Sequence, residues 1–216
     1  MNGMAALNWT GGLWATLLGY GLGAIPFGVL ITRFAGLGDL RSIGSGNIGA
    51  TNVLRTGKRW AAVLTLLCDA GKGAAAVLLA GQLFGSSGAM VAGLAAVFGH
   101  IFSIWLGFKG GKGVATVIGV LLGLYWPVGL LVIATWLAMA FLFKYSSLSA
   151  LTGMALAPAY MMAFGELTAA IFSLLLTIVI FITHHDNIYR LCHGTEPRIG
   201  KKASDIATTG AQPTDN

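Results

Sequence analysis

Charged residues are scarce in this chain of 216 residues, since Asp, Glu, Lys and Arg together make up only 9% of it. A soluble domain needs far more charge to cover its surface, and about a quarter of an average soluble sequence is charged. Hydrophobic residues make up 56% of the chain, and the mean hydropathy is +0.80. This balance excludes a soluble globular protein and indicates a polytopic membrane protein.

Cysteine is almost absent as well. Cys68 lies inside an apolar run and Cys192 in a polar segment, which argues against a stabilising disulfide. No spacing typical of a metal site occurs, so we expect no metal. We further expect no cofactor and no nucleic-acid partner, and a monomer is plausible. No Lys or Arg precedes the first apolar run, which is too long for a signal-peptide core, and we interpret it as a membrane span.

Several apolar segments reach the length of about 20 residues that a bilayer-crossing helix needs. They cover residues 13–34, 60–84, 89–108, 114–143, 148–164 and 167–183. As one helix, the fourth segment would extend about 45 Å at about 1.5 Å per residue, too long for one crossing. Its Tyr125-Trp126-Pro127 combines interfacial aromatic residues with a helix breaker. We therefore predict an all-α membrane protein, a bundle of seven transmembrane helices in which this segment forms a hairpin.

The basic residues support seven spans, because that count places twelve of thirteen on one side of the membrane. These twelve are Arg33, Arg41, Arg55, Lys58, Arg59, Lys109, Lys112, Lys144, Arg190, Arg198, Lys201 and Lys202. By the positive-inside rule, this side and the carboxyl end are cytoplasmic and the amino terminus is outside. Residues 1–200 are expected to form a single membrane domain, followed by a polar, disordered tail at 201–216.

The first glycine segment, residues 45–52, lies in the loop between the first two spans. Its glycines let backbone N–H groups converge on an anion, and its hydroxyl and amide side chains add donors. Arg55 follows and offers a guanidinium fork suited to a phosphate. A glycine-rich turn with an arginine that only follows the topology rule is the open alternative. The candidate ligands are Ser45, Gly46, Asn47, Gly49, Thr51, Asn52 and Arg55.

The second glycine segment, residues 108–113, precedes the fourth apolar segment. Its backbone donors and two lysines are expected to face a ligand at the positive end of a helix. It is not a Walker A loop, because Lys112 is followed by glycine rather than by Ser or Thr. A basic loop that only sets topology is the alternative. The candidate ligands are Lys109, Gly110, Gly111, Lys112 and Gly113.

Asp69, Lys72 and His100 are ionisable residues well inside predicted spans. Asp69 and Lys72 are three residues apart, on one face of the second span. Charges inside a membrane are costly, so these two are expected to face the bundle interior and to neutralise each other or a ligand. His100 lies in the third span, as a further candidate ligand or as a hydrogen-bonded interior histidine.

A last polar segment closes the final span. His184 and Asn187 are three apart and would share one face of a helix, so both could reach one polar group of a substrate. Glu196 follows beyond Gly194 and completes the set of candidates. An ordinary interfacial cap with snorkelling polar groups is the alternative.

Taken together, these segments resemble those of the bacterial acyl-phosphate:glycerol-3-phosphate acyltransferase family (PlsY), in the same order and from the first span to about Arg198. They read SGNIGATNVLR from Ser45, DAGKG from Asp69, GHIF from Gly99, FKGGKGVAT from Phe108 and HHDNIYRLCHGTE from His184. The resemblance implies seven helices in the bacterial inner membrane, with an active site on the cytoplasmic face. It also implies transfer of an acyl group from acyl phosphate to the 1-hydroxyl of sn-glycerol 3-phosphate, giving lysophosphatidic acid and phosphate.

The resemblance further implies roles for individual residues. Ser45, Arg55, Lys112, His184 and Asn187 are the expected catalytic residues that bind glycerol 3-phosphate. Backbone amides of the glycine segments are expected to hold the phosphate of the donor, and an apolar groove between helices its acyl chain, beside membrane lipid.

The sequence itself supports transfer without a covalent enzyme intermediate. A Gly-x-Ser-x-Gly nucleophile motif is absent, and the fifth residue after His100, His184 or His185 is never Asp. We therefore predict direct attack by the substrate hydroxyl, with either the donor's phosphate or His184 accepting the proton. The competing function is a transporter for an organic anion. It lacks support from inverted repeats, and the polar groups gather on one face instead of at the midplane.

Overall fold

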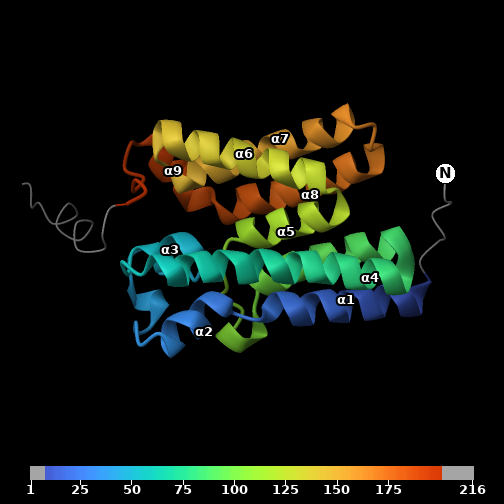
Figure 1. The fold of residues 1–216 in the computed structure, drawn as a ribbon, viewed down its shortest axis with the longest axis horizontal. Helices are drawn as coiled ribbons and strands as arrows, with labels where there is room; N and C mark the ends of the chain where they lie inside the picture. The colour runs from blue at the N-terminus through green and yellow to red at the C-terminus, as the bar shows by residue number, and fades with distance from the viewer. Residues whose placement is uncertain (1–7, 201–216) are drawn as a thin grey trace, which may run out of the picture.

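The structure, a computed structural model, describes residues 8–200 and contains within them only helices and connecting loops (Figure 1). The elements are α1 (Trp9–Ala24), α2 (Phe27–Phe34), η1 (Leu40–Ser42), α3 (Ala50–Leu54), α4 (Arg59–Ile101), η2 (Ile104–Leu106), α5 (Val114–Leu124), α6 (Trp126–Phe143), α7 (Ser146–Ala163), α8 (Leu167–Thr183) and α9 (His185–Cys192). The all-α prediction is confirmed for this part of the chain. The predicted disordered tail at 201–216 lies outside the described residues.

Three helical stretches are long and apolar enough to cross a membrane: Trp9–Phe34, Arg59–Leu106 and Trp126–Phe143. Helices α8 and α9 would make a fourth if they are counted as one broken span, although they are bent by 66°. This composition makes the chain an integral membrane protein. The count of seven spans and the orientation of the termini stay predictions.

Helix α4 consists of two antiparallel halves that meet at Gly85. The backbone of Gly85 has φ 72° and ψ −173°, a conformation open to glycine and strained for other residues. A Cβ at Gly93 would lie 3.1 Å from the Val77 side chain, and one at Gly81 would lie 3.5 Å from Ala89. Both pairs are centred on position 85, so the chain reverses there. The predicted division between residues 84 and 89 is confirmed.

The predicted hairpin within residues 114–143 is also confirmed. Tyr125 has an extended backbone (φ −153°, ψ 87°) between α5 and α6, and Pro127 lies in the first turn of α6, where a proline is tolerated. A Cβ at Gly129 would lie 2.6 Å from the Leu122 side chain, so α6 folds back against α5.

The first predicted span, residues 13–34, falls within the span-length stretch Trp9–Phe34, but the helix is interrupted inside it. Helix α1 ends at Ala24 and α2 begins at Phe27, with Pro26 between them. Proline lacks a backbone N–H and pushes the preceding residue into an extended conformation, which Ile25 adopts (φ −61°, ψ 116°).

Small residues let the helices approach closely. A Cβ at Gly19 would lie 2.1 Å from the carbonyl oxygen of Ala92, and one at Gly119 would lie 1.8 Å from that of Ala70. These contacts hold α1 against the second half of α4 and α5 against the first half. Large apolar side chains such as Leu83, Phe141 and Ile171 remain exposed, as expected of helices that face lipid.

The elements form two groups with α5 between them (Figure 1). One group contains α1 to α4 and the other α6 to α8. The short helices α3 and α9 lie at the same end of the molecule, opposite the start of α1 (Figure 1). Segments far apart in the sequence therefore converge at this end.

Candidate functional site

A cavity of about 660 Å³ lies between the two groups of helices. Its polar wall comes from the first glycine segment, the start of α5, α9 and the residues after α9. Its apolar wall comes from α4, α5 and α6 and includes Leu67, Leu122, Ile133 and Trp136. The volume lies within the usual range for small-molecule sites.

Most residues predicted from the sequence line this cavity. They are Ser45, Asn47, Gly49, Thr51, Asn52, Arg55, Asp69, His100, Lys112, Gly113, His184, Asn187 and Glu196. Five predicted residues lie outside its lining: Gly46, Lys72, Lys109, Gly110 and Gly111.

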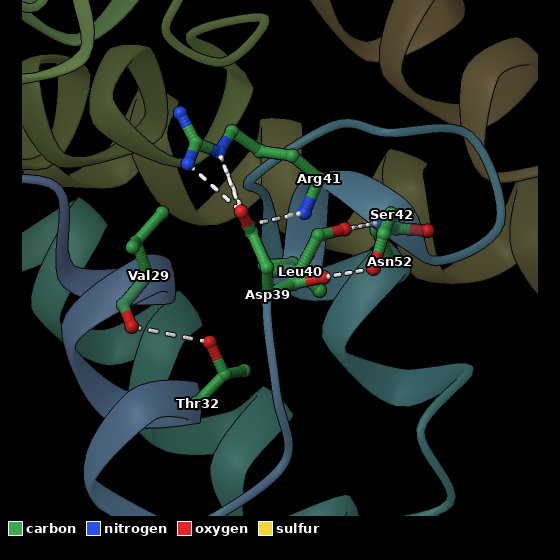
Figure 2. Close-up of polar contacts among 7 residues, drawn as sticks. All are labelled: Val29, Thr32, Asp39, Leu40, Arg41, Ser42 and Asn52. Carbon is green, nitrogen blue, oxygen red and sulfur yellow. Dashed lines mark hydrogen bonds and ion pairs between the residues drawn. The ribbon is translucent and has the colours of Figure 1, made fainter.

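Asn52 organises the first glycine segment. Its side chain is buried, and Nδ2 donates to the carbonyl oxygens of Leu40 at 3.0 Å and Ile43 at 2.8 Å. Figure 2 shows the Asn52 amide beside Leu40. Oδ1 accepts from the backbone N–H of Ser45 and from Nη1 of Arg55, both at 3.2 Å. Asn52 therefore orients the two predicted phosphate ligands.

Arg41, on the same loop, lies outside the cavity lining. Its guanidinium Nη2 lies 2.8 Å from Oδ2 of Asp39 at the exposed surface (Figure 2). The hydrogen bonds from Arg41 lower the pKa of Asp39 to about 2. Arg41 is therefore a matched control for variants of Arg55.

The second glycine segment divides into two parts with different tasks. Gly110 N–H donates to the carbonyl of Ile101 at 2.9 Å, and Gly111 N–H donates to that of His100 at 3.0 Å. These two carbonyls lie in the last turn of α4, where no N–H group of the helix is available to donate to them. The two amides were expected to face a ligand, and they cap α4 instead. Lys112 follows directly and reaches the cavity.

A chain of polar contacts joins Lys112 to the segment after α9. Lys112 Nζ donates to Asn187 Oδ1, and Asn187 Nδ2 donates to Glu196 Oε1 at 2.6 Å. Ser147 Oγ also donates to Oε1 at 2.6 Å, and Arg190 Nε donates to Oε2 at 2.7 Å. Glu196 thus fixes Asn187, which in turn contacts the lysine.

Partly buried positive charge, from Arg55 and Lys112, characterises the polar wall. Burial lowers the pKa of Arg55; Glu196 partly offsets this shift, and Arg190 adds to it. Burial also lowers the pKa of Lys112, with Arg190 adding to the shift and Glu196 opposing it. A bound phosphate would compensate both cations, because an opposite charge favours the protonated form.

His184 is the C-cap of α8, and the bend to α9 interrupts the continuous helix that the sequence suggested. Both His184 and Asn187 still line the cavity. His184 Nδ1 lies 2.8 Å from the carbonyl oxygen of Ile180, which can only accept, so Nδ1 carries the proton. Nε2 therefore holds a free lone pair. Burial lowers the pKa of His184 to about 4, so the ring is neutral at pH 7.

The lowered pKa of His184 predicts that the folded protein loses stability in acid. The folded protein takes up the His184 proton near pH 4, whereas the unfolded chain takes it up near pH 6.5. Between these values the unfolded state binds more protons, so acidification favours unfolding, by about 2 kcal/mol at pH 5. The apparent Tm in detergent should fall between pH 7 and pH 5, and it should fall less in His184→Gln. Parallel Tm profiles for the two proteins would contradict the shift.

Sequence reasoning missed five polar residues of the cavity lining: Ser146, Ser147, Asp186, Arg190 and Arg198. The two arginines were assigned only to topology. Ser147 follows Ser146 in the first turn of α7, and the Ser-Ser pair is typical of a helix start. Its contact with Glu196 joins positions 49 residues apart, which a single sequence does not reveal.

Comparisons with known proteins agree on one family. Residues 13–194 match the family model described as glycerol-3-phosphate acyltransferase. A glycerol-3-phosphate acyltransferase of Cereibacter sphaeroides is 56% identical over 203 residues, which is 94% of each chain. The crystal structure of PlsY in its glycerol 3-phosphate form aligns with a TM-score of 0.83 and 36% identity, over 88% of this chain and 96% of that one. The lysophosphatidic acid form of PlsY aligns with a TM-score of 0.80 and 32% identity, over 91% of this chain and 98% of that one.

Proposed function

Since the chain belongs to the glycerol-3-phosphate acyltransferase family, we propose that it transfers a fatty acyl group from acyl phosphate to the 1-hydroxyl of sn-glycerol 3-phosphate. The products are lysophosphatidic acid and inorganic phosphate. The similar crystal structures are described as a glycerol 3-phosphate form and a lysophosphatidic acid form, which supports this substrate and this product.

One observation carries the proposal: a single cavity joins a cationic polar wall to an apolar wall. Arg55 and Lys112 supply partly buried positive charge for a phosphate. Leu122, Ile133 and Trp136 supply an apolar surface for the first part of an acyl chain. A transporter for an organic anion has no need of such a wall, and family membership also favours acyl transfer.

The proposed reaction needs no covalent enzyme intermediate, because acyl phosphate is already an activated mixed anhydride. The 1-hydroxyl oxygen forms a bond to the acyl carbon, and the bond from that carbon to the phosphate oxygen breaks. Phosphate leaves with the electron pair and takes the hydroxyl proton. The enzyme contributes by positioning both substrates and by stabilising negative charge with Arg55 and Lys112.

His184 orients the attacking hydroxyl in this scheme. The Nε2 lone pair is free to accept a hydrogen bond from it, since Nδ1 is engaged by Ile180. A ring with a pKa of about 4 is a weak base at neutral pH, which favours the donor's phosphate as the proton acceptor.

His184→Ala should therefore raise KM for glycerol 3-phosphate by about 10-fold, the effect of one lost hydrogen bond, and leave kcat within a few-fold. Steady-state kinetics with each substrate varied in turn measures this. His185→Ala is the matched control, because His185 is exposed beside Asp186 and lies outside the cavity lining. A fall in kcat of about 100-fold at saturation would instead assign the proton transfer to His184.

We also propose that the cavity opens at the cytoplasmic face of a bacterial inner membrane, in a bundle of seven spans with the amino terminus outside. The reversals at Gly85 and Tyr125 support this count. Lys112 before α5 and Lys144 after α6 then lie on one side, as the positive-inside rule requires.

The function is tested by supplying purified protein with glycerol 3-phosphate and one donor at a time. Acyl phosphate, acyl-CoA and acyl carrier protein thioester are the three donors. We expect acylated glycerol 3-phosphate with acyl phosphate alone. Product from a thioester alone would overturn the assigned donor. No product from any donor, with uptake of glycerol 3-phosphate into proteoliposomes, would favour transport.

A further inference from the structure

Three ionisable side chains form a buried cluster between the two halves of α4: Asp69, Lys72 and His100, which we call the buried triad. Lys72 Nζ lies 2.7 Å from Asp69 Oδ1 and donates to the carbonyl of Ile25 at 2.8 Å. His100 Nδ1 lies 3.6 Å from the same Asp69 oxygen. All three side chains are at most 4% exposed. Asp69 and His100 border the cavity, whereas Lys72 lies outside its lining.

His100 of the triad contacts Gly111, the residue that precedes Lys112. A Cβ at Gly111 would lie 2.2 Å from Nε2 of His100, so the imidazole packs directly against the Gly111 backbone. The N–H of Gly111 donates to the carbonyl of the same histidine at 3.0 Å. The side chain and the backbone of His100 thus both hold position 111.

We propose that the buried triad positions Lys112 for glycerol 3-phosphate. Lys72 joins the Asp69 carboxylate to the carbonyl at the break between α1 and α2, and this carboxylate lies 3.6 Å from Nδ1 of the imidazole. The imidazole supports Gly111 and thereby fixes where Lys112 enters the cavity. The triad residues act as positioning residues, although the sequence suggested them as ligands. This inference rests on the proposed function, because the expected effect is on affinity for the acceptor substrate.

The reason for glycine at position 111 makes the proposal testable. The backbone of Gly111 is outside the left-handed region, so alanine is conformationally acceptable there. The obstacle is the His100 ring, which the variant His100→Ala removes. Gly110 is a matched control, because a Cβ there would lie 2.0 Å from the backbone carbonyl oxygen of His100. Truncating the histidine side chain leaves that obstacle in place.

The experiment is a double-mutant cycle on the full chain in detergent, read by KM for each substrate and by direct binding of radiolabelled glycerol 3-phosphate. Gly111→Ala and His100→Ala should each raise KM and Kd for glycerol 3-phosphate by about 10-fold or more, because small displacements of a binding group are costly. KM for acyl phosphate should stay within about 2-fold. In the His100→Ala background, Gly111→Ala should raise KM and Kd for glycerol 3-phosphate by little more than about 2-fold. Gly110→Ala should raise them in that background by the same factor as in the wild type.

The proposal would be overturned if Gly111→Ala and His100→Ala raised KM for glycerol 3-phosphate by factors that multiply in the double variant. Equal increases in KM for glycerol 3-phosphate and KM for acyl phosphate would also overturn it. Where His100→Ala fails to give a monodisperse protein, His100→Asn serves in the same cycle. Its shorter side chain vacates the position of Nε2 and keeps a donor for Asp69. The binding measurement separates this proposal from the proposed function. Coupled losses of glycerol 3-phosphate binding support the triad's role even if acyl phosphate is not the donor.

Discussion

Replacing Lys112 with methionine should lower kcat/KM for glycerol 3-phosphate by about 100- to 1,000-fold, which corresponds to about 3 to 4 kcal/mol. Methionine keeps much of the apolar side chain and removes the charge. The phosphate then loses a partly buried cation in the cavity lining, and Oδ1 of Asn187 loses its donor. Initial rates at varied glycerol 3-phosphate measure the effect.

Lys109→Met is the matched control for this variant. Lys109 is three residues earlier on the same segment, but it is exposed and lies outside the cavity lining. We expect near wild-type kinetics, because an exposed lysine contributes little to a buried site. Equal losses in the two variants would show that the segment acts through its general positive charge.

The second large effect is expected from Arg55→Lys, which should lower kcat/KM for glycerol 3-phosphate by about 10- to 100-fold although the charge is kept. Lysine lacks the planar fork that holds a phosphate through two parallel hydrogen bonds. The Arg55 guanidinium is oriented by Asn52 and packs over Gly44, where a Cβ would lie 2.8 Å from Arg55 Cδ. An ammonium group cannot reproduce both contacts.

Arg41→Lys serves as the control, since Arg41 contacts Asp39 at the surface and lies outside the cavity lining. Its kinetics should match those of the wild type. Wild-type kinetics in Arg55→Lys would remove Arg55 from the phosphate site.

The sequence predicted the chain reversals well because their signals are local. Tyr125-Trp126-Pro127 and the gap between residues 84 and 89 each interrupt an apolar run, and the helices break at both places. The break at Pro26 was missed, because the hydropathy stays high on both sides of this proline. Apolar length alone therefore does not separate one helix from two.

The sequence also identified most of the cavity lining, because polar residues are rare enough in this chain to stand out. It could not show which polar groups are already engaged by the protein. The amides of Gly110 and Gly111 cap α4, and Asn52 binds the loop before α3. These partners are up to 12 residues away along the chain and meet only when the helices pack. The task of a donor thus depends on the fold, even where the residue type suggests a ligand.

The central claim is that the cavity holds both substrates at once and that the hydroxyl attacks the acyl carbon directly. Purified protein is incubated with radiolabelled acyl phosphate, with and without glycerol 3-phosphate, and quenched within one turnover. The account predicts no label on the protein in either case, and equal amounts of acylated glycerol 3-phosphate and phosphate only when both substrates are present. Labelled protein that forms with acyl phosphate alone, and passes its label to glycerol 3-phosphate added later, would contradict it.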